Sequence, residues 1–289
     1  MSPFHIVLAI LVAALWGGNF VAAKITLQTL PPLTLLAVRF IITAILLWPF
    51  APKPTVPLKQ IFLLSTLLGV THFSLMFAAI YWGVALPNAV IATQLGVPFS
   101  CLLGTIFFKD MIGRWRALGM LVAFVGIVII VGTPSIANQF WPFMVSCLAA
   151  FAWAVANIQM KRIGQVHIMA LLSRLSLFAF PQLALLSMIF EHGQIEAIQS
   201  ASTQVWLGMA YTVLFSTIVA YGMWYYLLGR FPVSQVTPYS LLVPVFGILA
   251  SQWFFHTPLT TQFLIGGAFT MAGVAIIIFR RPQEGILEK

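Results

Sequence analysis

One apolar pattern occurs twice in the chain, as FFKDMIGRWRALGMLVAFVGIVIIVG at residues 107–132 and as FFHTPLTTQFLIGGAFTMAGVAIIIF at residues 254–279. Each copy opens with two phenylalanines and then carries two glycines seven residues apart, namely Gly119 and Gly126, then Gly266 and Gly273. The apolar part of each copy is long enough to cross a bilayer as one helix, which takes about 20 residues. The repetition indicates a membrane protein with an internal duplication.

The repeat extends back to the start of each half. Both halves carry a tryptophan, an asparagine, a lysine and, in the next apolar run, an arginine, which are Trp16, Asn19, Lys24 and Arg39, then Trp153, Asn157, Lys161 and Arg174. The tryptophan and the lysine are eight residues apart in both halves. One later run of each half also has a proline near its middle, Pro98 or Pro244. These matches together indicate that the whole chain is duplicated.

The composition excludes a water-soluble fold. Of the 289 residues 61% are hydrophobic and only 7% are charged, and the mean hydropathy is +1.04, so most of the surface must face a lipid bilayer. The net charge is +9, but the 14 basic residues are scattered and form no stripe that could follow a nucleic-acid backbone, so no nucleic-acid partner is expected. Cys101 and Cys147 lie in apolar runs, which argues against a disulfide framework or a zinc site.

Ten runs are apolar enough to span a membrane, at residues 3–23, 33–50, 60–82, 86–108, 115–132, 141–161, 168–190, 204–228, 234–254 and 262–280. Each half therefore has five spans, and an odd number makes the second copy enter the membrane from the opposite side. The predicted fold is an all-α integral membrane protein of ten transmembrane helices, arranged as an inverted five-plus-five repeat. Its predicted parts are a first repeat at 1–132, a second repeat at 141–281 and a cytoplasmic tail at 282–289.

The distribution of basic residues predicts the orientation, because basic loops stay in the cytoplasm. An N-terminus inside the cell places eleven of the 14 Lys and Arg residues on the inner side and only Lys24 on the outer side. Arg39 and Arg174 lie within spans, and Glu191 and Glu196 fall in an outer loop. Both termini are therefore predicted to be cytoplasmic.

Four stretches resemble a known family: Trp16-Gly17-Gly18-Asn19-Phe20, Ala220-Tyr221-Gly222-Met223-Trp224, Leu227-Leu228-Gly229-Arg230 and Tyr239-Ser240-Leu241-Leu242-Val243-Pro244-Val245. From about Ala14 to about Phe279 the chain resembles the EamA family of the drug/metabolite transporter superfamily, which is built from two five-helix repeats. It is most similar to the branch that exports cysteine and O-acetylserine from bacteria.

The resemblance implies efflux of small amino-acid-like metabolites across the bacterial inner membrane. It also implies a cavity lined mainly by the first, third, fourth, sixth, eighth and ninth spans. The family usually has an acidic residue at the turn before the fifth and tenth spans. Asp110 fills that position in the first half, but His256-Thr257 occupies it in the second. We interpret this departure as drift at a loop.

The sequence contains no constellation for covalent chemistry, so we expect no enzyme. All five acidic residues lie in loops or the tail, which leaves no buried carboxylate pair for acid–base catalysis: Asp110, Glu191, Glu196, Glu284 and Glu288. The histidines are dispersed and lack metal-ligand spacing. We therefore expect neither a metal nor a cofactor.

Polar and aromatic side chains at membrane depth are the candidates for binding a small-molecule substrate, because a buried polar group usually faces a cavity or a partner helix. The predicted substrate-binding residues are Trp16, Asn19, His72, Gln94, Trp153, Asn157, Tyr221, Trp224 and Tyr239. The alternative for each is a simple hydrogen bond between neighbouring helices. His72 is also the candidate for proton coupling, since a free imidazole titrates near neutrality.

Lys24, Lys161, Pro98 and Pro244 are the predicted gating residues. The two lysines end matched spans on opposite faces, where they would either snorkel or, as their side opens, act as a gate or meet a substrate carboxylate. The two prolines would kink matched spans. For Arg39 and Arg174 we expect a structural role, with each reaching the interface or bonding backbone carbonyls. The paired glycines would allow close helix packing, either within the chain or at the contact of a homodimer.

These observations favour a secondary transporter that exports small amino-acid-type metabolites by alternating access, with cysteine and O-acetylserine suggested by the resemblance alone. Two alternatives remain at this stage. One is an exporter of cationic drugs or quaternary amines, held by aromatic rings, although the expected cavity carboxylate is absent. The other is a membrane scaffold or sensor that has kept the fold and does not transport.

Overall fold

The computed structural model describes residues 1–108, 113–132, 134–164, 166–228, 230–231 and 236–279. In the first half the helices are α1 Pro3–Thr26, α2 Pro32–Leu47, α3 Leu58–Leu64, α4 Phe73–Tyr81, α5 Leu86–Thr93, α6 Gly96–Phe108 and α7 Arg114–Val131. In the second half they are α8 Pro134–Ala137, α9 Phe140–Ile163, α10 Ile168–Phe190, α11 Gln194–Ser200, α12 Thr203–Ala210, α13 Ala220–Leu228, α15 Leu242–Phe255 and α16 Thr261–Phe279. These elements confirm the predicted all-α membrane fold. The tail at 282–289 and Asp110 lie outside the described residues.

Short non-α segments complete several spans. A π-helical segment, Ser65–His72, joins α3 to α4, and a second, Tyr211–Val219, joins α12 to α13. A 3₁₀ turn, Thr237–Leu241, precedes α15. Counted with these segments, nine helices of the described chain are long and apolar enough to cross a membrane, and the apolar helix at Tyr239–Phe255 is shorter. Each agrees closely with one of the ten predicted spans.

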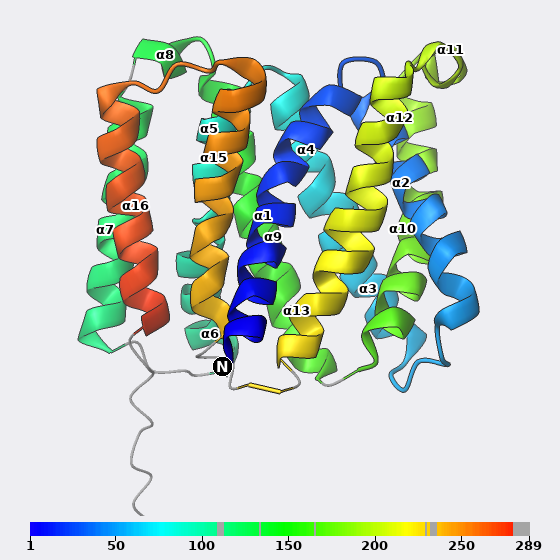
Figure 1. Ribbon diagram of the computed structural model, residues 1–289, viewed down its shortest axis with the longest axis horizontal. Coiled ribbons are helices and arrows are strands. Elements are labelled where there is room, and N and C mark those ends of the chain that lie inside the picture. Colours follow the sequence, from blue (N-terminus) through cyan, green and yellow to red (C-terminus); the bar gives the residue numbers. More distant parts are fainter. Residues whose placement is uncertain (109–112, 133, 165, 229, 232–235, 280–289) are drawn as a thin grey trace, which may run out of the picture.

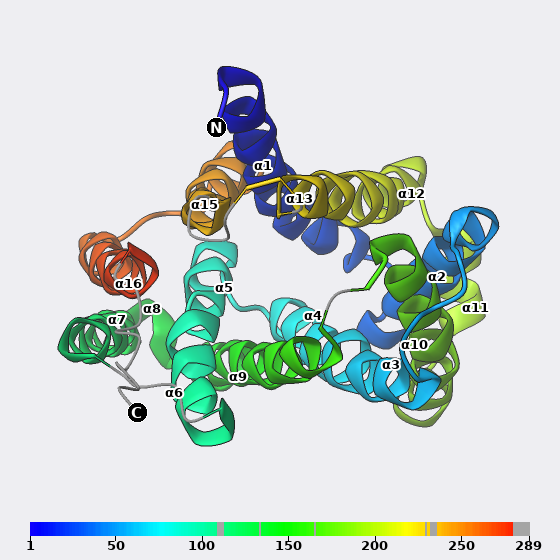
Figure 2. The same ribbon diagram turned by 90° about the horizontal axis from the view of Figure 1, so that it is seen from below.

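The helices of the two halves pack against each other in matched pairs. Helix α1 packs against α15 and against the α12–α13 run, while α9 packs against α6 and against the run that contains α4. Figure 2 shows that α2 and α10 pair at one end of the molecule and that α7 and α16 pair at the other. Exchanging the halves leaves this pattern unchanged, which is the signature of the inverted two-repeat architecture.

The repeated glycines lie at the contact between α7 and α16. A Cβ on Gly126 would lie 2.5 Å from the carbonyl oxygen of Gly266, and one on Gly119 would lie 2.8 Å from that of Gly273. Only glycine allows two backbones to approach so closely. The sequence left open an internal or an external partner for these glycines, and in the structure the seam joins two helices of one chain.

The two predicted gating prolines, Pro98 and Pro244, lie at matched places in the fourth and ninth spans, each just after an interruption of the α-helix. The fourth span divides at Gln94-Leu95 into α5 and α6, and Pro98 lies in the first turn of α6. Because Pro98 has no N–H, the carbonyl of Gln94 instead accepts a 3₁₀-type bond from Val97 N (3.1 Å). In the second half Pro244 lies in the first turn of α15, directly after the 3₁₀ turn.

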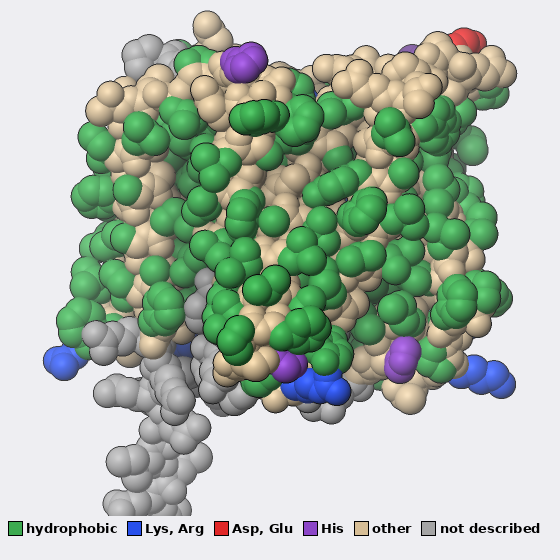
Figure 3. Space-filling view, viewed as in Figure 1, with side chains coloured by type: hydrophobic (Ala, Val, Ile, Leu, Met, Phe, Trp, Pro, Cys, Tyr) green, Lys and Arg blue, Asp and Glu red, His purple; other side chains and the backbone are tan. Residues whose placement is uncertain are grey.

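The surface divides into an apolar flank and two polar ends (Figure 3). Lys and Arg side chains gather at the end that carries the N-terminus, which we call the N-terminal face, and an acidic side chain marks the opposite face. Hydrophobic side chains cover the flank between these ends, and large ones such as Val128 and Trp253 are exposed. Such a surface is typical of a protein whose solvent is lipid.

Candidate substrate site between the repeats

Three predicted aromatic residues form one cluster where α1 meets the eighth span. The Trp16 ring lies 5.2 Å, between ring centroids, from both Tyr221 and Trp224. Its Nε1–H donates to the carbonyl oxygen of Ser216 at 3.1 Å, in the π-helical segment. A π-helical turn leaves some carbonyls without their usual partners, and rings with a polar edge can satisfy them while presenting an apolar face.

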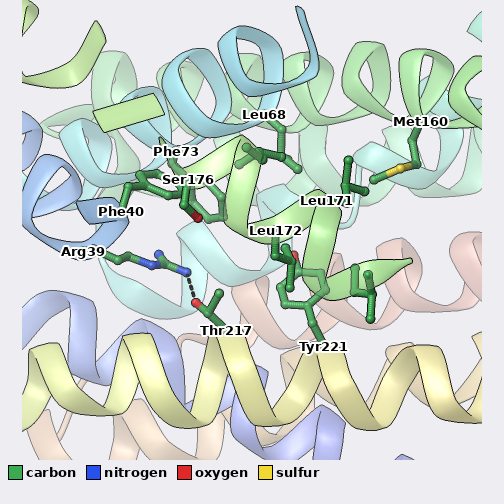
Figure 4. Close-up of a pocket in the computed structure, with 12 residues that line it drawn as sticks. Arg39, Phe40, Leu68, Phe73, Met160, Leu171, Leu172, Ser176, Thr217 and Tyr221 are labelled. Atoms are coloured by element: carbon green, nitrogen blue, oxygen red, sulfur yellow. Dashed lines mark hydrogen bonds between the residues drawn. The ribbon is translucent and has the colours of Figure 1, made fainter. Parts of the chain in front are cut away.

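A small cavity of about 30 Å³ lies beside this cluster (Figure 4). Its walls come from the second, third, sixth, seventh and eighth spans, and its lining residues are Arg39, Phe40, Leu68, Phe73, Met160, Ile168, Leu171, Leu172, Leu175, Ser176, Thr217 and Tyr221. Tyr221 belongs both to the cavity and to the aromatic cluster. The two features therefore form one continuous region between the repeats.

Arg39 is the charged group of this cavity. Its side chain is 2% exposed, and Nη2 donates to Thr217 Oγ1 at 3.0 Å, across the interface between the halves. The guanidinium carbon lies 4.7 Å from the centroid of the Phe73 ring. Nε and Nη1 are buried and have no hydrogen-bond partner. The expectation that Arg39 reaches the membrane–water interface or bonds backbone carbonyls is therefore wrong, because the side chain turns inward and bonds the hydroxyl of Thr217.

Thr217 holds Arg39 from within the π-helical segment. Its hydroxyl also donates to the carbonyl oxygen of Thr212, five residues earlier, at 2.7 Å. Thr71 makes the matching bond to Thr66 O at 2.9 Å in the first half. Threonine thus satisfies a carbonyl that the wider turn frees in both repeats, and in one repeat it also contacts a cation. The one-residue expansion of the turn could not be recognised from hydrophobic periodicity.

His72 lies outside this cavity. The side chain is buried, and Nδ1 is 2.8 Å from the carbonyl oxygen of Ala149 in α9. Because a carbonyl oxygen only accepts, Nδ1–H is the donor of this bond between helices. The His72 ring also packs against Phe73, with 4.9 Å between centroids. Phe73 lines the cavity, so His72 touches the wall without entering it.

Gln94, Trp153 and Asn157 lie in a second region, at the contact of the fourth and sixth spans. Asn157 Nδ2 donates to Ser100 Oγ at 3.1 Å. The Trp153 ring covers Gly96, where an added Cβ would lie 2.6 Å from the ring. Gln94 lies at the break in the fourth span and is partly buried. These contacts join the fourth and sixth spans, whereas those of the Trp16 cluster join the first and eighth.

The two remaining predicted residues are Asn19, which lacks a partner, and Tyr239, which lies at the edge of the Trp16 cluster. Asn19 Oδ1 is buried without a hydrogen-bond partner. Asn19 follows its tryptophan by three residues, whereas Asn157 follows Trp153 by four, so the two amides point about 100° apart around their helices. Tyr239 packs against a small apolar cluster that includes Ala9 and Leu227, and Trp224 of the aromatic cluster packs against the same residues.

The two predicted gating lysines make matched contacts across the repeats. Lys24 Nζ lies 4.4 Å from the centroid of the Phe255 ring, at the end of α15. Lys161 Nζ lies 4.0 Å from the centroid of the Phe108 ring, at the end of α6. Each contact joins the first helix of one repeat to the fourth span of the other, and the two lie at opposite faces. Cation–π contacts of this kind contribute about 0.5–2 kcal/mol.

The architecture and the site define a multi-pass membrane protein built from two inverted five-helix repeats. The EamA-like transporter family model matches residues 3–132 and 140–279, so the chain belongs to this family.

Similar proteins are transporters by name. The chain is 32% identical over 282 residues to a "Probable amino-acid metabolite efflux pump" of Salmonella typhimurium, covering 94% of each chain. It is 30% identical to a protein of the same description from Escherichia coli, covering 96% of each. An "Uncharacterized transporter" of Archaeoglobus fulgidus is 27% identical over 96% of this chain and 99% of its own. One crystal structure shares the fold, with a TM-score of 0.64 at 15% identity over 96% of each chain. These names indicate a transporter rather than an enzyme.

Proposed function

We propose that this protein is a secondary transporter that exports small amino-acid-type metabolites across the bacterial inner membrane by alternating access. The observation that carries the proposal is the full-length similarity to two bacterial proteins described as probable amino-acid metabolite efflux pumps. Cysteine- and O-acetylserine-like compounds and other neutral amino acids are the proposed substrates. The basic N-terminal face supports an orientation with both termini in the cytoplasm.

Alternating access is supported by irregular backbone segments that occur at matched places in the two repeats. The third and eighth spans both contain a π-helical segment, and in the fourth and ninth the α-helix is interrupted just before a proline. Irregular backbone at membrane depth is tolerated where it is buried or lines a cavity. In this account the Lys24–Phe255 contact closes one face and the Lys161–Phe108 contact closes the other, so the carrier works by releasing them in turn.

The chemistry of the cavity argues against the cationic-drug alternative. Arg39 is a buried cation, and none of the residues that line the described cavity is acidic. A cationic substrate would meet an unscreened like charge there, and no carboxylate would offset the loss of its hydration. An anionic or zwitterionic substrate would meet an opposite charge.

Counterflow in liposomes tests the proposal. Purified protein is reconstituted, and exchange of labelled cysteine, O-acetylserine, threonine and a cationic dye is measured with and without a pH gradient. Saturable exchange of an amino acid supports the carrier, and acceleration by the gradient would direct attention to His72. The Trp16→Ala variant should lose exchange, whereas Trp253→Ala, at a residue that is 79% exposed, should keep it. Movement of the dye alone favours the drug exporter, and no movement by folded protein favours the scaffold.

A further inference from the structure

Arg39 retains hydrogen-bonding capacity that the protein does not use. A guanidinium has five N–H donors, of which Nε and Nη1 carry three. In this structure Nε and Nη1 have no partner, and Nη2 bonds Thr217. Buried donors of a charged group are costly to leave unsatisfied, so their persistence at a cavity wall indicates that a ligand completes them.

No acidic side chain neutralises Arg39 in the part of the chain that the structure describes. The cavity lining contains no carboxylate. The carboxylate of Glu191, directly after α10, lies at the start of α2, where it accepts hydrogen bonds from Leu33 N at 2.7 Å and Thr34 N at 2.9 Å. The three rings nearest the guanidinium, Phe73, Phe40 and Phe77, lie 4.7–5.9 Å from it and offset only part of its lost hydration.

The matched arginine of the second repeat behaves differently, which singles out Arg39. Arg174 is only partly buried, and its guanidinium lies 3.8 Å from the centroid of the Trp48 ring, a ring that is itself exposed. Its Nη1 also lacks a hydrogen bond, but Arg174 does not line the cavity. Stacking on a ring near the end of a helix is ordinary behaviour for an arginine in a membrane protein. The inward cation is therefore particular to the first repeat.

We propose that Arg39 binds the carboxylate of the transported substrate, so that the carrier selects metabolites with a free carboxylate. This assignment rests on the proposed export function. A planar guanidinium matches a carboxylate through two parallel hydrogen bonds, and a cavity of about 30 Å³ has room for a group of that size. Tyr221 lines the cavity (Figure 4), and its ring also contacts Trp16. The amine and side chain of the substrate would lie against these two rings once the site opens.

Competition experiments on the reconstituted full-length carrier test this assignment. Exchange of labelled L-threonine is inhibited with unlabelled L-threonine or with L-threoninamide, in which a neutral carboxamide replaces the carboxylate. Wild type should prefer the acid by about tenfold or more, and Arg39→Lys should raise KM by a similar factor, because lysine cannot pair in a bidentate way. The Arg39→Gln variant should also lose the preference for the acid. The matched control, Arg174→Lys, should keep both KM and the preference.

The outcomes separate this assignment from the proposed function. Exchange with equal inhibition by the acid and the amide, or an unchanged preference in Arg39→Gln, overturns the carboxylate assignment while transport stands. Absence of exchange by wild type overturns the proposed function. The carboxylate site is then tested by ligand binding instead of by transport. The unfolding temperature of detergent-purified protein is measured with L-threonine, O-acetylserine or L-lactate. A rise in wild type and not in Arg39→Gln supports the carboxylate site, and no rise with any of the three overturns it.

Discussion

Lys24 Nζ lies 4.4 Å from the centroid of the Phe255 ring, in a contact that joins the first helix of one repeat to the end of the fourth span of the other. Lys161 and Phe108 repeat the contact at the opposite face. A protein that only needed its lysines to snorkel would not require a ring of the other repeat beneath each of them. The pair gives the molecule one equivalent closure at each end.

Removing one closure should loosen one face only. Lys24→Met keeps the length of the side chain but removes the cation, and the loss of about 1 kcal/mol should speed local opening about fivefold. Hydrogen–deuterium exchange should therefore rise at the ends of α1 and α15 and stay unchanged at the end of α9. Lys161→Met should give the converse. Equal acceleration at both faces in either variant would show that the contacts do not act separately.

Glu191 should stabilise the start of α2 from the other repeat. Its carboxylate accepts the N–H groups of Leu33 and Thr34 and the hydroxyls of Thr34 and Ser187 at 2.7–2.9 Å. Glu191→Gln replaces one acceptor oxygen with a donor and removes the charge, which should cost about 1–2 kcal/mol of unfolding free energy. Thermal unfolding in detergent measures this loss. Glu196→Gln, at an exposed position of α11, is the control, and an equal loss in both variants would refute the capping role.

The glycine seam should not tolerate a methyl group. A Cβ on Gly126 would lie 2.5 Å from Gly266 O and from Thr270 N, so Gly126→Ala must push α7 and α16 apart and should cost about 1–3 kcal/mol. Gly132→Ala is the matched control, because its Cβ would lie 3.5 Å from the carbonyl oxygen of Ile129, an ordinary contact distance, and its backbone is helical. Unfolding measurements on both variants check this, and similar stabilities would mean that the seam is loosely packed.

Trp16 should stabilise the π-helical segment through its indole N–H. Trp16→Phe keeps an aromatic ring but leaves the carbonyl oxygen of Ser216 without this donor, which should cost about 1–2 kcal/mol. Trp153, the matched ring, makes no hydrogen bond among the described residues, so Trp153→Phe should cost less. Thermal unfolding of the two variants side by side measures the difference. A larger loss in Trp153→Phe would contradict the assigned role of the indole.

The fold could be predicted from the sequence because membrane solvent imposes strong rules. Apolar length fixes each span, the odd number of spans per half fixes the inversion, and both follow from the residues alone. The predicted fourth span, 86–108, even agrees with α5 and α6 at both limits. Its internal break lies at Gln94-Leu95, before Pro98, because a proline disturbs the carbonyl of the preceding turn.

The site was harder to predict because it depends on directions of side chains. A π-helical turn adds one residue, and this rotates every later residue of the eighth span by about 100° without altering its apolar character. Thr217 therefore has no signal in the sequence, which predicts instead that Arg39 reaches the membrane–water interface or bonds backbone carbonyls. The asymmetry between Arg39 and Arg174 is equally hidden, because their neighbours along the chain suggest the same role. The matched lysines, by contrast, had a clear signal in their spacing from Trp16 and Trp153.

Cross-linking each closure in turn tests most directly whether the two faces open alternately. Lys24→Cys with Phe255→Cys, or Lys161→Cys with Phe108→Cys, is introduced after Cys101→Ala and Cys147→Ala, a background that must itself retain exchange. A short bifunctional maleimide then joins either pair in reconstituted protein. If the two faces open alternately, locking either face stops amino-acid counterflow, while the same variants without the cross-linker still exchange. Counterflow at the unlocked rate with either face joined would contradict it.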